Sequence, residues 1–260
     1  MKDDFLLKIK YIKDNRFLKY TGPMKNAILP ECFKASTDLT GKMNRLTVSA
    51  DPDGNIRLRK CEIVVKHSFT ETERLFLNGY QSWTDSCEHS ISDKQKGLPL
   101  PGKLLNPLYR LKRYGDYEFV KQPEKPGFFH GWTYAYIRER GLPKISLIAS
   151  LNIDECFNLI GFSFPDYDIR ISADCSGLLL KDKMNLLDIL FVDDDEDAAF
   201  DLWFSMMGIK KPDTPRSIGW TSWYNHYENI DEQKIIRNLE AFTDKNLPID
   251  IFKIDDGFQT

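Results

Sequence analysis

The sequence predicts a multidomain protein of the class β then α/β, with an N-terminal β-sandwich followed by the beginning of a parallel α/β domain. Residues 1–192 contain many short runs of β-branched and aromatic residues separated by turn signals, as is typical of a sandwich. Residues 216–260 instead contain a strand, an amphipathic helix and a second apolar strand. We interpret residues 193–215 as a helical linker between these two domains.

The strands of the first domain are predicted from runs that suit a pleated, partly buried surface. They are Phe5–Ile12, Leu46–Ala50, Asn55–Leu58, Cys61–Val65, Phe128–Arg138, Ile145–Leu151, Phe157–Phe164 and Leu186–Val192. The turn signal of residues 51–55, Asp-Pro-Asp-Gly-Asn, predicts a hairpin connection. Residues 88–127 are richer in Lys, Gly and Pro, and we expect long loops or edge strands there.

An acidic run, Asp193–Asp197, precedes residues 198–207, which have helical character. The run could form a Ca²⁺ site, or it could place negative charge at a helix N-terminus, where the helix dipole favours it. We favour the second interpretation. Gly208 is expected to end this helix, and Lys210–Pro215 lead into the second domain.

The helix of the second domain is predicted from one apolar face and from signals at both ends. The apolar face consists of Ile235, Ile236, Leu239 and Phe242. Asp231 is the expected N-cap, and a capping box of Asn229 with Glu232 is the alternative. Asn246 can adopt a left-handed cap, and Pro248 prevents the helix from continuing.

Function in α/β units concentrates where parallel strands end. The sequence places Trp223 and Tyr224 at this point of the first strand, and Asp255 and Asp256 at the end of the second. An aromatic ring offers a flat apolar face to the C–H face of a sugar ring. Ionised carboxylates accept strong hydrogen bonds from hydroxyl groups. The combination therefore suggests a sugar-binding site.

Each of these signals also has a purely structural explanation. Asp-Gly after a strand is a common turn signal, and Trp220 or Trp223 could belong to the core. Paired Asp residues could hold Mg²⁺ or Ca²⁺, but no further acidic or His ligands cluster nearby in the sequence. The four histidines are dispersed: His67, His89, His130 and His226. We expect no metal and no cofactor, and the joint position of the acids and aromatics favours sugar binding.

Three motifs resemble a known family. Gly219-Trp-Thr-Ser-Trp-Tyr224 and Ile254-Asp-Asp-Gly-Phe-Gln259 resemble the start of the barrel in family 36 glycoside hydrolases, which are α-galactosidases and raffinose-synthase relatives. Asn78-Gly-Tyr-Gln-Ser-Trp83 is similar to a stretch of that family's N-terminal β-domain. The resemblance covers the whole chain in domain order. It implies that residues 1–192 are a β-supersandwich and that residues 216–260 are the first β-α-β of a truncated (β/α)8 TIM barrel.

The resemblance also implies roles for individual residues. Asp255 and Asp256 correspond to the tandem Asp that binds the hydroxyls of the terminal galactose in the family. Trp223 and Tyr224 correspond to a pair that lines the same pocket, and Trp83 is a candidate for its rim. Neighbouring strand residues point to opposite faces, so the two Asp residues are better suited to binding adjacent hydroxyl groups than to acting as the nucleophile and the acid/base of one reaction.

The family's nucleophile and acid/base are Asp residues of later barrel strands, which would lie beyond Thr260. No catalytic residue is therefore assigned in this chain, and we expect the 260-residue chain to be an inactive fragment. Phe258 and Thr221 depart from the residues usual in the family. The expected function is an α-galactosidase-like retaining glycoside hydrolase acting on terminal α-D-galactosyl residues of oligosaccharides. The alternatives are a galactosyl transfer enzyme of raffinose-synthase type and a non-catalytic carbohydrate-binding module.

Composition excludes several other classes. The net charge of −3, with Lys and Arg spread along the chain, argues against a nucleic-acid surface. No apolar run approaches the ~20 residues that span a bilayer, and the N-terminus lacks a signal-peptide core. The five cysteines show no C-x-x-C spacing and are expected to be reduced core thiols. These features lead us to expect a cytoplasmic protein with a small-molecule or oligosaccharide substrate, and the full-length enzyme could be a homo-oligomer.

Overall fold

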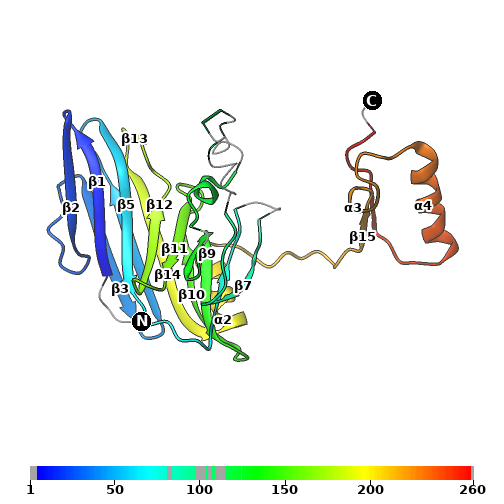
Figure 1. The fold of residues 1–260 in the computed structure, drawn as a ribbon, viewed down its shortest axis with the longest axis horizontal. Coiled ribbons are helices and arrows are strands. Elements are labelled where there is room, and N and C mark those ends of the chain that lie inside the picture. Colours follow the sequence, from blue (N-terminus) through cyan, green and yellow to red (C-terminus); the bar gives the residue numbers. More distant parts are fainter. Residues whose placement is uncertain are drawn as a thin grey trace. The chain divides into compact units, whose positions relative to one another are not determined.

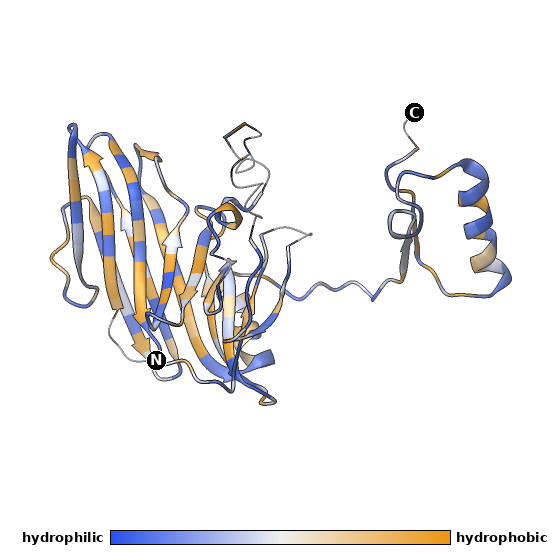
Figure 2. Ribbon diagram, viewed as in Figure 1, coloured by the Kyte–Doolittle hydropathy of each residue, from blue (hydrophilic) through white to orange (hydrophobic). Residues whose placement is uncertain are grey.

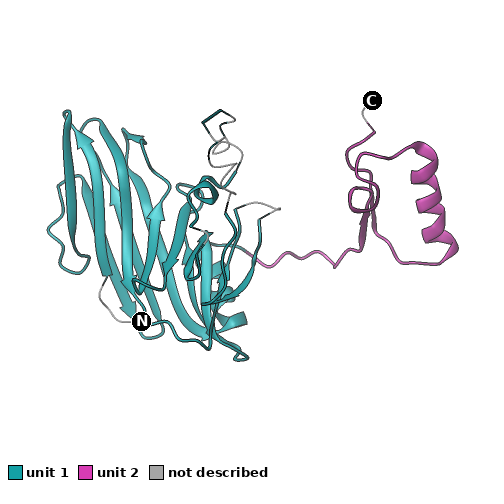
Figure 3. Cartoon of the chain, in the orientation of Figure 1, with its two compact units in different colours: residues 1–209 teal, residues 210–260 magenta. Residues whose placement is uncertain are grey.

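The chain divides into two compact units, Met1–Ile209 and Lys210–Thr260 (Figure 3). The computed structural model describes residues 5–80, 84–97, 104, 107–108, 110, 115–123 and 125–258. Within these residues, the strands of unit 1 form two large antiparallel sheets, and those of unit 2 form one parallel pair (Figure 1). The predicted β-rich character of the first part is therefore confirmed, and its sheets are antiparallel.

The first sheet of unit 1, called sheet A here, has the strand order β2-β1-β5-β12-β11-β8, and β13 also pairs with β5. Its strands are β1 (Phe5–Lys13), β2 (Arg16–Pro23), β5 (Ile56–Lys66), β8 (Phe128–Trp132), β11 (Asn158–Ser163), β12 (Asp168–Ala173) and β13 (Leu179–Leu180). A tight turn joins β1 to β2, and its central residues Asp14 and Asn15 have φ values of 50° and 59°. Asp and Asn tolerate this left-handed conformation better than most residues, so they suit a two-residue hairpin turn.

The second sheet, called sheet B here, has the strand order β3-β4-β14-β10-β9-β6-β7. Its strands are β3 (Phe33–Thr40), β4 (Met43–Ala50), β6 (Glu73–Leu77), β7 (Cys87–Ser90), β9 (Tyr134–Glu139), β10 (Lys144–Ser150) and β14 (Met184–Asp195).

The two sheets correct two of the sequence predictions. The predicted strand Phe128–Arg138 is broken at Thr133, whose φ of 69° sends the chain from β8 in sheet A to β9 in sheet B. The turn at residues 51–55 connects β4 to β5 across the two sheets, so it is not a hairpin.

The core of unit 1 lies between sheets A and B. Along β12, Ile169 and Ile171 are fully buried, whereas Arg170 and Ser172 lie on the opposite face. Buried and less buried residues also alternate along most of β1 and β11, and Figure 2 shows alternating hydropathy along strands of this sheet. The core includes residues of both sheets, among them Leu7, Ile9, Ile63 and Ile171 from sheet A and Leu46, Val48, Ile189 and Phe191 from sheet B. Period-two patterning thus places one face of each sheet in a shared core.

The other face of sheet B is covered by helix α2 (Glu196–Met206). Trp203 of α2 is buried there, and its ring N–H donates to the carbonyl oxygen of Ser150 at 2.8 Å. Because β14 is covered on both faces, its run Leu186–Val192 is apolar on both faces except at Asp188, which pairs with Arg45. The predicted helical linker over residues 193–215 is corrected. Residues 193–195 continue β14, and α2 packs on sheet B as part of unit 1.

Unit 2 consists of a short β-α-β arrangement. Its elements are β15 (Gly219–Thr221), α3 (Trp223–His226), α4 (Glu232–Asp244) and β16 (Ile251–Lys253). β15 and β16 are parallel, and Trp220 stacks on Phe252 with ring centroids 4.4 Å apart. The capping prediction for α4 is confirmed, since the Asp231 carboxylate accepts from the Lys234 backbone N–H at 2.8 Å and Asn246 has a φ of 50°. The full barrel stays a prediction.

Two further sequence expectations concern the cysteines and membrane-spanning segments. Four of the cysteines are buried as expected, but Cys87 is exposed and is not part of the core. Burial raises the pKa of Cys156 to about 11 and that of Cys175 to about 12, which keeps both thiols protonated at neutral pH. No helix among the described residues has the length and apolar character needed to span a membrane.

Candidate functional site

The candidate site is built where β15 and β16 of unit 2 end. Thr221 is the last residue of β15, and its hydroxyl donates to Oδ2 of Asp255 at 3.2 Å. The Asp255 backbone N–H donates to the hydroxyl oxygen of Ser222 at 2.9 Å, and Ser222 is fully buried. The Ser222 N–H in turn donates to the carbonyl oxygen of Lys253 at 3.1 Å. These bonds tie the segment after β16 to the end of β15.

Asp255 is held as an anion. The Lys253 ammonium donates to its Oδ2 at 2.8 Å, and the Asp256 backbone N–H donates to its Oδ1 at 3.1 Å. The hydrogen bond from Lys253, followed by that from the Asp256 N–H, lowers the pKa of Asp255. Asp255 is therefore ionised at neutral pH. Each carboxylate oxygen has two lone pairs, so the anchored group can still accept a hydrogen bond from a ligand hydroxyl.

Asp256 is exposed beside Asp255. Its carboxylate makes no hydrogen bond with any residue that the structure describes, so it is available to a ligand. The next residue, Gly257, has a φ of 104°, and a Cβ built on it would lie 2.6 Å from the carbonyl oxygen of Glu228. The backbone after β16 therefore packs closely against the backbone that follows α3, which only glycine permits. This contact fixes where the acidic pair sits.

Trp223 and Tyr224 are not in the first strand, which corrects the prediction. β15 ends at Thr221, and the chain turns into α3, where the His226 N–H donates to the carbonyl oxygen of Ser222 at 2.9 Å. Trp223 is half-buried and packs edge-to-face against Tyr227, with ring centroids 5.5 Å apart. The Tyr224 side chain is 82% exposed. Both aromatics still directly follow Ser222, the residue that binds the Asp255 backbone.

Other aromatic and His residues of this segment have structural roles. Trp220 packs between strands and helix, with its ring 6.1 Å from that of Phe242 on α4. His226 receives a hydrogen bond from the Asn238 side chain of α4 at 3.1 Å. The core interpretation of Trp220 and the structural interpretation of His226 agree with these contacts.

Trp83, the candidate for the rim, lies outside the described residues. The described start of its motif, Asn78–Tyr80, is anchored in unit 1. The Asn78 side-chain amide donates to the carbonyl oxygen of Trp132 at 2.9 Å, and the Tyr80 ring packs edge-to-face on the Trp132 ring at 5.1 Å. This part of the motif is held firmly against the end of β8.

Sequence reasoning missed three residues that shape the site, namely Thr221, Ser222 and Lys253. Thr221 and Lys253 are direct partners in the parallel register, and both bind the same oxygen of Asp255. The available signal was that Thr221 and Lys253 carry hydrogen-bond donors and that Lys253 lies two residues before Asp255. The strand register that brings Thr221 beside Lys253 was not evident from the sequence.

The arrangement is suited to accepting hydrogen bonds. A carboxylate whose pKa is lowered by an ammonium group is a poor proton donor at neutral pH. Its neighbour Asp256 offers a second, exposed acceptor, and exposed aromatic rings follow the adjacent strand. Such a set can bind vicinal hydroxyl groups of a sugar.

No family model matches the chain, and no curated protein matches it. Among solved structures, the chain is similar to the crystal structure of the α-galactosidase from Lactobacillus brevis, with 9% identity and a TM-score of 0.40. The similarity covers 98% of this chain and 36% of the other, so the chain spans about a third of that enzyme's length.

Proposed function

We propose that unit 2 forms part of the sugar-binding site of a retaining glycoside hydrolase that acts on terminal α-D-galactosyl residues of oligosaccharides. In this proposal Asp255 and Asp256 accept hydrogen bonds from the galactose hydroxyls. Trp223 and Tyr224 provide apolar faces for the sugar ring. The proposal assigns neither the nucleophile nor the acid/base to the described residues.

The observation that carries the proposal is the position of the acidic pair at the ends of two parallel strands. Asp255 is bound by groups of both strands, Thr221 and Lys253, and is kept ionised by the second of them. The carboxyl ends of parallel strands are where α/β enzymes place their ligand sites. The sequence motifs around both strand ends, which resemble those of the family 36 glycoside hydrolases, support galactose as the ligand.

The test is a titration of the ¹⁵N-labelled 260-residue chain with methyl α-D-galactopyranoside, followed by NMR. We expect saturable shifts of the Ser222, Asp255 and Gly257 amides, because these backbone groups surround the carboxylates. Methyl α-D-glucopyranoside, which differs in the orientation of one hydroxyl, should bind more weakly. Asp256→Asn keeps the shape of the side chain and removes its charge, so it should raise the dissociation constant about tenfold or more.

Asp244→Asn is the matched control, because Asp244 is an exposed Asp at the end of α4, away from the strand ends. It should leave the dissociation constant unchanged. The proposal fails if the galactoside produces no saturable shift in residues 219–257, or if Asp256→Asn and Asp244→Asn bind it equally well.

A further inference from the structure

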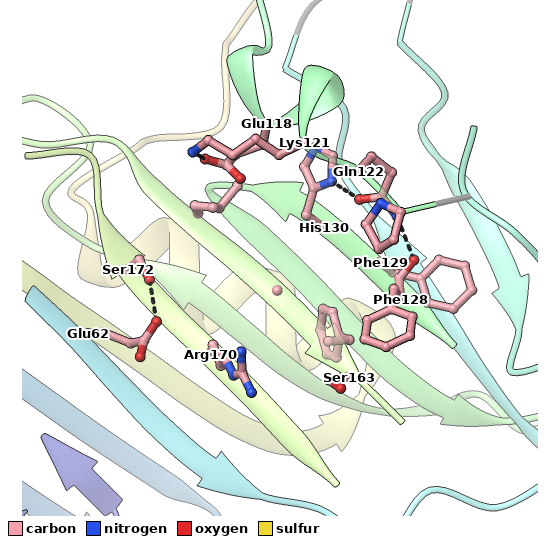
Figure 4. Close-up of a pocket in the computed structure, with 14 residues that line it drawn as sticks. Glu62, Glu118, Lys121, Gln122, Phe128, Phe129, His130, Ser163, Arg170 and Ser172 are labelled. Atoms are coloured by element: carbon pink, nitrogen blue, oxygen red, sulfur yellow. Dashed lines mark hydrogen bonds and ion pairs between the residues drawn. The ribbon is translucent and has the colours of Figure 1, made fainter. Parts of the chain in front are cut away.

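A pocket of about 240 Å³ lies on the outer face of sheet A, within unit 1 (Figure 4). Strands β12, β11 and β8 form its floor, and the 3₁₀ helix η2 (Tyr117–Val120) with the residues that follow it forms one side. All of its lining residues belong to unit 1. A ligand of this pocket would therefore bind at a site distinct from the sugar site proposed in unit 2.

The pocket lies where Gly161, which has no side chain, stands between Arg170 and His130 on the neighbouring strands. Gly161 of β11 pairs with Arg170 of β12 on one side and with His130 of β8 on the other. A Cβ built on Gly161 would meet only two backbone oxygens, both 3.9 Å away, so there is open space above it. Its φ is in the range open to every residue, so backbone conformation does not demand glycine here. Glycine weakens a strand interior, and it often marks a place where another molecule approaches the backbone.

Buried polar groups stand on both sides of this gap. On one side Glu62, which is 4% exposed, accepts from the Ser172 hydroxyl at 3.1 Å. On the other side His130, which is 7% exposed, is hydrogen-bonded through Nδ1 to Oε1 of Gln122 at 2.8 Å and through Nε2 to Oδ2 of Asp116 at 2.6 Å. These hydrogen bonds fix the positions of the polar groups in the absence of a ligand, which reduces the entropy lost on binding.

The charges on the pocket wall are paired within the protein. Lys60 binds Glu62 at 2.8 Å, and Arg170 binds Asp168 at 2.8 Å. Lys121 pairs with Glu118 on the η2 side. A wall without excess charge of either sign favours a neutral ligand over an ion.

We propose that this pocket binds one neutral sugar ring. Sugar hydroxyl groups can donate to the Glu62 carboxylate and to the Ser172 hydroxyl oxygen, and they can accept from the Arg170 guanidinium group. Phe128 is partly exposed on the same face and offers an aromatic surface to the C–H groups of the ring. The volume is below the roughly 300–1,000 Å³ of pockets for drug-sized ligands, which suits a single ring.

The test is an NMR titration of the ¹⁵N-labelled full chain with the methyl α-glycosides of glucose, galactose and mannose, and with inorganic phosphate as the anionic probe. At least one glycoside should shift the amides of His130, Gly161 and Arg170 saturably. A dissociation constant on the order of 1 mM is expected for a ligand with about a dozen heavy atoms. Shifts of these amides report on this pocket, and shifts in residues 219–257 report separately on the site in unit 2.

Gly161→Val fills the gap with a side chain that suits a strand, so it should preserve folding while raising the dissociation constant about tenfold or more. Lys10→Val is the matched control, because Lys10 is exposed on β1 of the same sheet and does not line the pocket. Phe128→Leu, which keeps apolar volume but removes the flat ring, provides a second variant if Gly161→Val fails to fold. The inference is overturned if no glycoside shifts the three amides saturably, if only phosphate does, or if every folded pocket variant binds as tightly as the parent.

Discussion

Replacing Gly257 with alanine is expected to detach the acidic pair from the segment that follows α3. The new Cβ would lie 2.6 Å from the carbonyl oxygen and 2.8 Å from the Cα of Glu228, and both are backbone atoms that cannot rotate away. A residue other than glycine at a φ of 104° is also strained by about 1–3 kcal/mol. Relief of the clash adds about 1–3 kcal/mol, as overpacking does elsewhere. The native loop is thus destabilised by about 2–6 kcal/mol.

Amide hydrogen exchange measures this effect directly. The Ser222 and Asp255 amides are bonded across the two strand ends, so their protection reports on whether the loops stay together. Every 1.4 kcal/mol changes the population of the open state about tenfold, so even the lower estimate predicts an increase in exchange of more than about tenfold. The galactoside should bind correspondingly more weakly.

Substitutions at two other glycines distinguish the steric clash from the strain of a positive φ. Gly219→Ala, also in unit 2, places its Cβ 3.6 Å from that of Ile251, which is ordinary contact, and it should leave exchange unchanged. Gly141→Ala, at a φ of 81° with open space around it, introduces the conformational strain without a clash. It should destabilise its own turn less than Gly257→Ala destabilises the unit 2 loop. If the Ser222 and Asp255 amides of Gly257→Ala were as protected as those of the parent, the close contact with Glu228 would not hold the two loops together.

Three further predictions concern stability and activity. Burial opposes ionisation of Asp116, but the hydrogen bond and the charge of His130 outweigh it and lower the pKa of this carboxyl group below 3.8. The ionised Asp116 therefore stabilises the fold above pH 3.8, and this stabilisation is lost as the pH falls through the pKa of the folded state. The stability difference between parent and Asp116→Asn in urea unfolding should therefore shrink below pH 3.8, and a constant difference would contradict this. Trp203→Phe removes the hydrogen bond to Ser150 and should lower the free energy of unfolding by about 1–3 kcal/mol. Trp203→Ala also removes the packing of the ring and should lower it by about 3–5 kcal/mol. Equal losses would mean that the hydrogen bond, not packing, holds α2 on sheet B. The purified 260-residue chain should not hydrolyse an aryl α-galactoside above a mock preparation, and measurable turnover would show that the chain contains a catalytic pair.

Local patterns were sufficient to predict several elements. The ends of α4 were predictable because the N-cap at Asp231 and the left-handed Asn246 depend on neighbouring residues only. Strands such as β10 and β14 were predictable because burial leaves a long apolar run. Strand β2 was missed because it lies at the edge of sheet A and is mostly exposed, so selection for burial leaves no clear pattern in it.

The remaining features depend on contacts between distant parts of the chain. Thr133 carries no turn signal, yet its positive φ splits one apolar run between two sheets. The presence of β15 and β16 could be predicted from the sequence, but the end of β15 could not, because the turn of Trp223 into α3 depends on bonds around Ser222 that no local pattern reveals. The pocket above Gly161 requires the pairing of three strands, so it could not have been inferred from the sequence around that glycine.

The most direct test of the account is a crystal structure of the chain soaked with D-galactose. We predict that the sugar lies at the ends of β15 and β16, with hydroxyl oxygens about 2.5–3.0 Å from the carboxylates of Asp255 and Asp256. The C–H face of the ring should lie against Trp223 or Tyr224. Galactose bound in unit 2 without a hydroxyl contact to either carboxylate, or found only outside unit 2, would contradict the account.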